Sequence, residues 1–410
     1  MKHKLKIFII GLLLITACLK AQNNLVLNPS FEGLRNCPND GDEADSALNW
    51  NWISSLIPTN GACKGELFTP CCSNPTYCSS PYNGVGFQKA RTGNSYIGLQ
   101  TTYFCPIPIN NYRDYLKGQL SSALQTGKNY CLTFYYNASD RLTYATNRFG
   151  AYLDDGAISS YNCCKDIPVT PQVQNNPAIF MSDTMNWVKI QGSFTAIGNE
   201  NTITLGNFVD SATIQFQLFN SNGTINPYYL IDDVSLLPMD LPAYAGHDTS
   251  IAQNDSAYIG RTSEVGLDDD CIWYVLGNAT AIDTIAGKWV KPSTTTSYAV
   301  EQNICGTVTY DTVIVNVSPL GINKLSANDK QINVYPNPSS GELYISSNDL
   351  SNKDLKVEIT DIAGRIVLQN SYAVNNGLVK INTQLTNGVY FIRVVNSTGE
   401  IQIQKIIFNN

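Results

Sequence analysis

Short stretches in which apolar and polar residues alternate recur along the whole chain, and they constrain its fold most. The segments 201–205, 213–219, 307–317 and 388–395 follow this two-residue period and lie between Gly, Asn or Pro turns. Such a period is typical of strands with one buried face, so we predict an all-β chain. In one stretch, 112–125, apolar residues fall near a 3.6-residue period, which predicts either a short helix or a turn that leads into a strand.

The length of 410 residues predicts two or three domains, each with its own core. Two Pro-containing breaks in composition, near 237–242 and 318–330, divide the chain. We therefore predict three β-sandwich domains in tandem, at 22–239, 240–319 and 331–410, with a linker at 320–330. Only 14% of residues are charged and 43% are hydrophobic, as expected of a chain that folds rather than of a disordered one.

Charge and histidine content exclude several classes of function. The chain has 26 basic residues and 33 acidic ones, and four of the lysines lie before residue 22, so the rest carries 22 basic residues and a net charge of about −11. This charge argues against nucleic acid and anionic lipid as partners. The two histidines, His3 and His247, are too few for a multi-histidine zinc site, and His3 lies in the leader.

The first 21 residues predict a signal peptide. A basic start precedes the apolar run 7–17, and Ala21 precedes a plausible cleavage point. The alternative is a lipoprotein signal, in which Cys18 is lipidated and anchors the protein. Eleven apolar residues are too few to cross a bilayer, which takes about 20, so we predict no transmembrane span.

Twelve cysteines indicate an oxidising compartment. Nine of them lie between Cys37 and Cys164, and their spacing favours disulfides over a zinc site. Because nine is odd, one thiol of this region must stay free, pair between chains or bond outside the region.

The two ends of the first region, 24–32 (NLVLNPSFE) and 228–236 (YYLIDDVSL), resemble the first and last strands of the galactose-binding-like jelly rolls. This superfamily includes many carbohydrate-binding modules. A jelly roll brings these strands together, and the resemblance implies that Glu32, Asp232 and Asp233 hold a structural Ca²⁺. The alternative is that Glu32 accepts a hydrogen bond from a backbone amide and that the aspartates cap a strand end.

Aromatic side chains are the candidate ligand-binding residues, because sugars stack on aromatic faces. Trp50 and Trp52 are two residues apart, although both could instead line the core. Tyr77, Tyr82 and Tyr103 lie in a Cys-rich insertion, 57–108, and are better placed to be exposed. We predict non-catalytic binding of a carbohydrate or another surface ligand. The alternatives are a glycoside hydrolase with paired carboxylates and an adhesion protein that binds another protein.

In the second region, Cys271 and Cys305 lie 34 residues apart, and Trp273 follows the first of them by two. This pattern resembles the small Ig-like or polycystic-kidney-disease-like spacer modules of secreted bacterial proteins. The resemblance implies a Cys271–Cys305 disulfide.

The third region contains turn and strand motifs at characteristic spacing: Tyr335, Pro336, Asn337, Pro338 and Gly341, then Asp361, Gly364 and Arg365, then Gly388, Tyr390 and Lys405. With these motifs it resembles the type A sorting domain of the type IX secretion system. Independently of this resemblance, the residue types predict a hairpin turn at 361–364 and a turn before a strong strand at 387–388. The resemblance implies Sec export followed by type IX secretion to the cell surface or the medium, with the secretion machinery as a partner.

Overall fold

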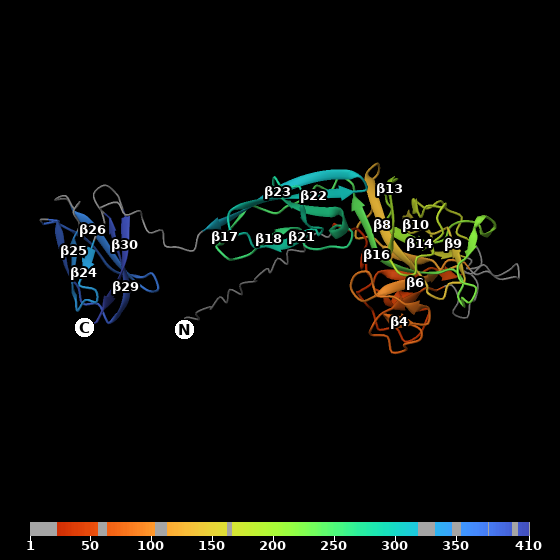
Figure 1. Cartoon of the computed structure of the whole chain (residues 1–410), viewed down its shortest axis with the longest axis horizontal. Coiled ribbons are helices and arrows are strands. Elements are labelled where there is room, and N and C mark those ends of the chain that lie inside the picture. Colours follow the sequence, from red (N-terminus) through yellow and green to blue (C-terminus); the bar gives the residue numbers. More distant parts are fainter. Residues whose placement is uncertain are drawn as a thin grey trace, which may run out of the picture. The chain divides into compact units, whose positions relative to one another are not determined.

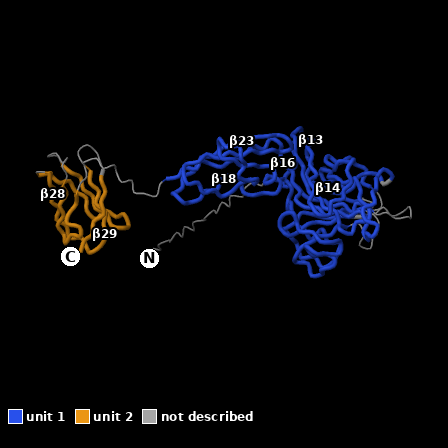
Figure 2. The backbone as a smooth tube through the Cα atoms, in the orientation of Figure 1, with its two compact units in different colours: residues 1–318 blue, residues 319–410 orange. Residues whose placement is uncertain are grey.

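The computed structural model describes residues 23–55, 64–102, 113–161, 166–318, 333–346, 354–375, 377–395 and 401–409. Their regular elements are strands and three short 3-10 turns, η1 (Ala44–Ser46), η2 (Ser211–Thr213) and η3 (Asp268–Asp270), so the predicted all-β fold is confirmed for this part. The chain divides into two compact units, 1–318 and 319–410 (Figure 2). The leader with Cys18, the linker 320–330, Tyr103 and four cysteines lie outside the described residues (Cys63, Cys105, Cys163 and Cys164).

The first region is a β-sandwich of two five-stranded sheets. One sheet has the order β1 (Trp50–Trp52), β7 (Leu116–Gln119), β14 (Thr202–Gly206), β10 (Gly150–Asp154) and β12 (Val173–Gln174). The other has the order β13 (Val188–Thr195), β8 (Asn129–Ala138), β16 (Tyr228–Pro238), β6 (Tyr96–Gln100) and β3 (Glu66–Phe68). Smaller pairs are β2 (Ser54–Ser55) with β11 (Ser160–Tyr161), β4 (Tyr82–Asn83) with β5 (Gly86–Phe87), and β9 (Tyr144–Thr146) with β15 (Phe216–Leu218).

The start of the first region lies beside its last strand. The Leu25 amide donates to the Leu236 carbonyl over 3.0 Å, and the Val234 amide donates to the Pro29 carbonyl over 2.9 Å. The predicted meeting of the two chain ends is therefore confirmed, and it places Glu32 in the same part of the sandwich as the Asp232–Asp233 pair.

The segment 112–125 contains a strand rather than a helix in its described part, 113–125. Residues 116–119 form β7 between β1 and β14, with Leu116 and Gly118 buried and Gln119 exposed. Trp50 packs where any side chain at Gly118 would lie, so this position belongs to a sheet interior. The two-residue period at the centre of the segment outweighs the weak helical period around it.

The second region is also built from two sheets, but it is not separated from the first. One sheet has the order β17 (Thr249–Ala252), β23 (Thr307–Ser318), β22 (Thr296–Ile304), β19 (Cys271–Val275) and β20 (Ala281–Asp283), and the other pairs β18 (Ala257–Gly260) with β21 (Gly287–Val290). Its core contains Cys131 and Leu237 from the first region. The first two regions therefore form one compact unit, seen side by side in Figure 1.

The predicted Cys271–Cys305 disulfide is wrong. Cys305 bonds to Cys131 on β8, and Cys271 is a buried free thiol. Cys271 lies opposite Gln302 on the neighbouring strand, whereas Cys305 lies three residues further, in the turn between β22 and β23. Because Cys131 bonds outside its own region, it accounts for the odd number of cysteines there. Two further disulfides in the described residues, Cys37–Cys71 and Cys72–Cys78, brace the insertion.

The second unit, 319–410, is a smaller sandwich. A three-stranded sheet, β24 (Asn333–Tyr335), β25 (Glu342–Ser346) and β28 (Leu378–Asn382), packs with a four-stranded sheet, β27 (Ile366–Tyr372), β26 (Leu355–Asp361), β29 (Gly388–Val395) and β30 (Ile401–Phe408). Leu343, Ile359 and Ile392 from both sheets share one buried core.

Candidate functional site

Two of the tyrosines predicted to bind a ligand are exposed on the Cys-rich insertion. Tyr82 is 69% exposed and Tyr77 is 52% exposed. Tyr82 lies opposite Phe87 across the β4–β5 hairpin, and the two ring centroids are 4.6 Å apart. The Gly84 amide donates to the Thr76 carbonyl, which holds the hairpin against the segment that carries Tyr77. Phe87 was not predicted from the sequence as a ligand-binding residue, although its position across a short hairpin from Tyr82 could have indicated that role.

The two tryptophans do not join this surface. Trp50 is fully buried against Phe31 and donates from Nε1 to the Asn28 carbonyl over 2.9 Å. Trp52 is partly buried, and the Lys64 ammonium lies 4.8 Å from its ring centroid. For Trp50 the core alternative is therefore correct.

The three acids predicted to bind calcium converge on one loop, 91–95, which supplies them with protein donors. Glu32 accepts the backbone amides of Asn94 and Ser95 at 2.8 and 2.7 Å. Asp232 accepts the Arg91 amide at 2.8 Å, and Asp233 pairs with the Arg91 guanidinium at 2.6 Å.

No group of three metal-binding side chains gathers anywhere in the described part of the chain. With a guanidinium at Asp233 and backbone amides at Glu32, this geometry does not fit a Ca²⁺ site. It corresponds to the alternative for Glu32, in which the carboxylate accepts backbone amides.

Arg91 also joins the two regions of the first unit. Its guanidinium bonds to Asp269 of the second region at 2.7 Å and lies 3.6 Å from the Tyr135 ring centroid. Burial and the neighbouring Asp233 raise the pKa of Asp232 well above its ordinary value. Burial also raises the pKa of Asp233, although the Arg91 guanidinium opposes that rise.

A second pair of acids, the partly buried Glu66 and the buried Asp114, was not foreseen. Glu66 at the start of β3 accepts a hydrogen bond from the Tyr228 hydroxyl, and burial raises the pKa of Glu66 to about 8. Asp114 accepts the Gln100 amide at 2.6 Å, and burial together with Glu66 raises the pKa of Asp114 well above its ordinary value. Glu66 and Asp114 are far apart in sequence and come together only because β3 pairs with β6. The sequence alone therefore does not indicate this pair.

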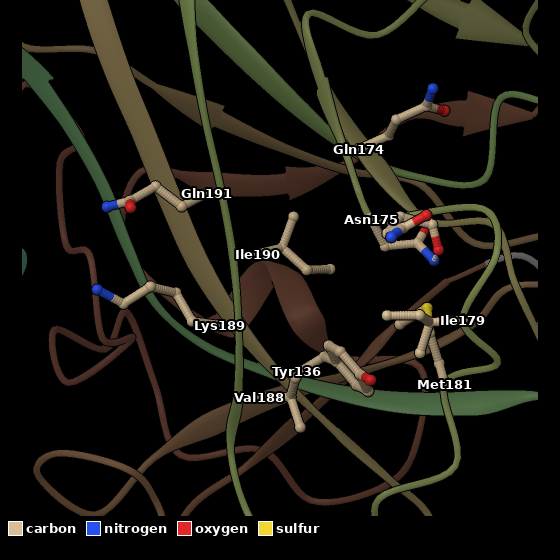
Figure 3. Close-up of a pocket in the computed structure, with 10 residues that line it drawn as sticks. Tyr136, Gln174, Asn175, Ile179, Met181, Val188, Lys189, Ile190 and Gln191 are labelled. Atoms are coloured by element: carbon tan, nitrogen blue, oxygen red, sulfur yellow. Dashed lines mark hydrogen bonds between the residues drawn. The ribbon is translucent and has the colours of Figure 1, made fainter. Parts of the chain in front are cut away.

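A pocket of about 240 Å³ lies between the edge strands β12 and β13 (Figure 3). Tyr136, Ile190 and Met181 form its apolar part, and burial raises the pKa of Tyr136 to about 12, so its hydroxyl stays protonated. The polar residues Gln174 and Gln191 also line it. None of these residues was predicted as a site.

In the second unit, the motif residues tie the first strand to the last. The Asn337 amide group donates to the Lys405 carbonyl over 2.9 Å and accepts the Ile407 amide over 2.8 Å. The peptide bonds before Pro336 and Pro338 are cis. Gly341 has a φ of 123°, and a Cβ there would lie 2.9 Å from the Thr383 carbonyl oxygen, so only glycine fits.

The turn and strand motifs of this unit also have structural partners. Asp361 accepts from Arg365 through both the backbone amide and the guanidinium across the β26–β27 turn, where Gly364 has a φ of 77°. The predicted hairpin turn at 361–364 is therefore confirmed. Gly388 begins β29, and Tyr390 packs edge-on against Phe408 with ring centroids 5.6 Å apart. Tyr335 is 44% exposed and stacks on Tyr344.

Residues 333–409 match the family described as the secretion system C-terminal sorting domain. The second unit is a sorting domain. A sorting domain of this kind implies export to the cell surface or the medium, with the type IX secretion machinery as a partner. The described part of the chain contains no helix long and apolar enough to cross a membrane.

The other comparisons add no further family. No curated protein matches the chain. Similar solved structures include the chicken CNTN1 FN1–FN3 domains, at 13% identity and a TM-score of 0.18 over 52% of this chain and 83% of that one. The Drosophila OTK extracellular domains 3–5 match at 10% identity and a TM-score of 0.22 over 72% of this chain and 90% of that one. Likenesses this weak support no argument about the chain.

Proposed function

We propose that this exported protein is a non-catalytic binding protein whose first region binds carbohydrate at the surface formed by Tyr77, Tyr82 and Phe87. The observation that carries the proposal is the exposed pair Tyr82–Phe87, 4.6 Å apart on a hairpin of a disulfide-braced insertion. Exposed aromatic rings with little else to cover them provide the faces on which sugar C–H groups stack. The sorting domain supports delivery to the place where such ligands occur.

A glycan array probed with the purified exported protein tests this proposal. Tyr82→Ala should weaken binding of the selected glycan roughly tenfold, because it removes one stacking face. Trp289→Ala is the matched control: Trp289 is equally exposed, at 69%, but lies on β21 of the second region. Equal affinities for the two variants, or a glycan-independent signal, would contradict the proposal.

One observation favours the hydrolase alternative. A carboxyl with a pKa raised to about 8 beside a second acid is suited to general acid catalysis. If the selected glycan is cleaved, and if Glu66→Gln abolishes cleavage while Tyr82→Ala mainly weakens binding, the protein is a hydrolase that acts through Glu66 and Asp114. Binding without cleavage supports the non-catalytic proposal.

A further inference from the structure

The pocket between β12 and β13 is lined by four consecutive residues of an edge strand, 188–191. Successive side chains of a strand point to opposite faces. Figure 3 shows this here, because Lys189 and Gln191 point away from Ile190. Four consecutive residues can line one pocket only if the pocket runs along the backbone edge of the strand. The wall of the pocket is therefore the unpaired side of β13.

The hydrogen bonds of the ladder show which backbone groups face the pocket. The Ala196 amide donates to the Lys128 carbonyl, and the Met239 amide donates to the Asn129 carbonyl. In β8, even-numbered residues thus bond towards β13 and odd-numbered residues towards β16, because the direction alternates in an antiparallel ladder. Val188 and Ile190 lie opposite Tyr136 and Phe134 and bond to β8. The backbone groups of Lys189 and Gln191 point outward.

These outward groups have no backbone partner within the described ranges. The strand β12 lies at the edge of the opposite sheet, and Val173 packs against Gly192 without pairing with β13. An amide and a carbonyl at Lys189, and a second pair two residues on at Gln191, present a ladder that an added strand would complete.

The pocket beside this ladder has an apolar inner wall. Ile190, Tyr136 and Met181 are 4%, 5% and 1% exposed and form its inner wall, and Ile179, 58% exposed, stands at the mouth. The neighbouring side chains on the other face of β13, Lys189 and Gln191, are exposed. An added strand would place one side chain inward over Ile190 and its neighbours outward beside Lys189 and Gln191.

We propose that the edge of β13 is a second binding site, which takes an extended peptide segment by strand addition. The peptide pairs its backbone with Lys189 and Gln191 and inserts one apolar side chain into the pocket, between polar neighbours. A peptide matches this site better than a sugar does, because the free donors and acceptors repeat with the two-residue period of a polypeptide. The site is distinct from the Tyr77–Tyr82–Phe87 surface and does not depend on the carbohydrate proposal.

Hydrogen exchange of the full exported chain tests the site. The probes are synthetic nine-residue peptides with threonine at all positions except the central one, which is Val, Ile, Leu or Phe. A bound peptide should slow exchange of the Lys189 and Gln191 amides at least tenfold and leave those of Val188 and Ile190 unchanged. A peptide that is N-methylated at the two residues flanking the central one cannot donate to β13 and should not give this protection.

Two variants at one position separate backbone pairing from side-chain contact. Gln191→Pro removes an outward amide without touching the β13–β8 ladder, as proline is tolerated on a free edge, and should weaken peptide binding at least tenfold. Gln191→Ala keeps the amide and should change binding less than about twofold. An unchanged melting temperature shows that each variant folds. Equal binding by both variants, no protection by any of the four peptides, or protection by saccharides instead would overturn the proposal.

Discussion

The carboxyl groups of Asp233, Glu66 and Asp114 in the first unit differ in the partners that surround them. Burial raises the pKa of Asp233, and its hydrogen bonds to the Thr92 hydroxyl and the Arg91 guanidinium oppose that rise. Glu66 and Asp114 have only uncharged donors in the described contacts, the Tyr228 hydroxyl and the Gln100 amide. Burial without a cation favours the protonated acid, which is why the pKa values of Glu66 and Asp114 are raised.

Glu66 should make the first unit less stable as the pH rises. Its pKa is 4.5 in the unfolded chain and about 8 when folded, so the folded state binds more protons between these values. The contribution of Glu66 is fully present below pH 4.5 and is lost as the pH rises through 8. Glu66→Gln mimics the protonated acid and should reduce the loss in unfolding free energy between pH 5 and 8 by on the order of 2 kcal/mol.

Urea unfolding at pH 5 and pH 8 measures this difference. Asp255→Asn, at an exposed turn residue, is the control and should leave the pH dependence unchanged. The same pH dependence in wild type and Glu66→Gln would show that Glu66 titrates normally in the folded protein.

At the scale of elements, the sequence predicted what local pattern determines and missed what packing determines. Alternation located β23 and β29, because one buried face per strand leaves a direct trace in sequence. The exposure of Tyr77 and Tyr82 followed from their place in a Cys-rich loop. The partner of Cys305, by contrast, is set by the packing of two sandwiches, and the β13 pocket by segments that meet only after folding. Neither leaves a local pattern.

The Cys131–Cys305 disulfide should stabilise the joint between the first and second regions. It links residues 174 apart in sequence across the two cores. The double variant Cys131→Ser with Cys305→Ser should lower the unfolding free energy of the first unit by roughly 2–4 kcal/mol. Cys271→Ala, at the buried free thiol, is the matched control and should cost only about 1 kcal/mol.

Peptide mapping of the non-reduced exported protein checks the connectivity directly. The expected products are a peptide pair that contains Cys131 and Cys305, and a separate peptide with a free Cys271. A linked Cys271–Cys305 pair would contradict the Cys131–Cys305 assignment.

At the scale of the molecule, the chain combines a disulfide-braced unit with a sorting domain that contains no cysteine. The sorting domain has its own core, so its folding does not require oxidation. The binding surfaces proposed above all belong to the first unit. Delivery and binding are thus assigned to separate compact units, and each should be alterable without loss of the other.

Deleting 331–410 should therefore leave a folded first unit in the periplasm of a host with type IX secretion, instead of at the surface or in the medium. Gly341→Val should have the same effect as a point change, because its Cβ would collide with the Thr383 carbonyl where β25 begins beside the end of β28. Ile362→Ala, at a side chain that is 79% exposed in the β26–β27 turn, is the control and should be exported normally. Cell fractionation with immunodetection measures all three, and glycan binding by the periplasmic first unit shows that it remains folded. Surface display of the deleted chain at wild-type level would mean that the sorting domain does not direct export.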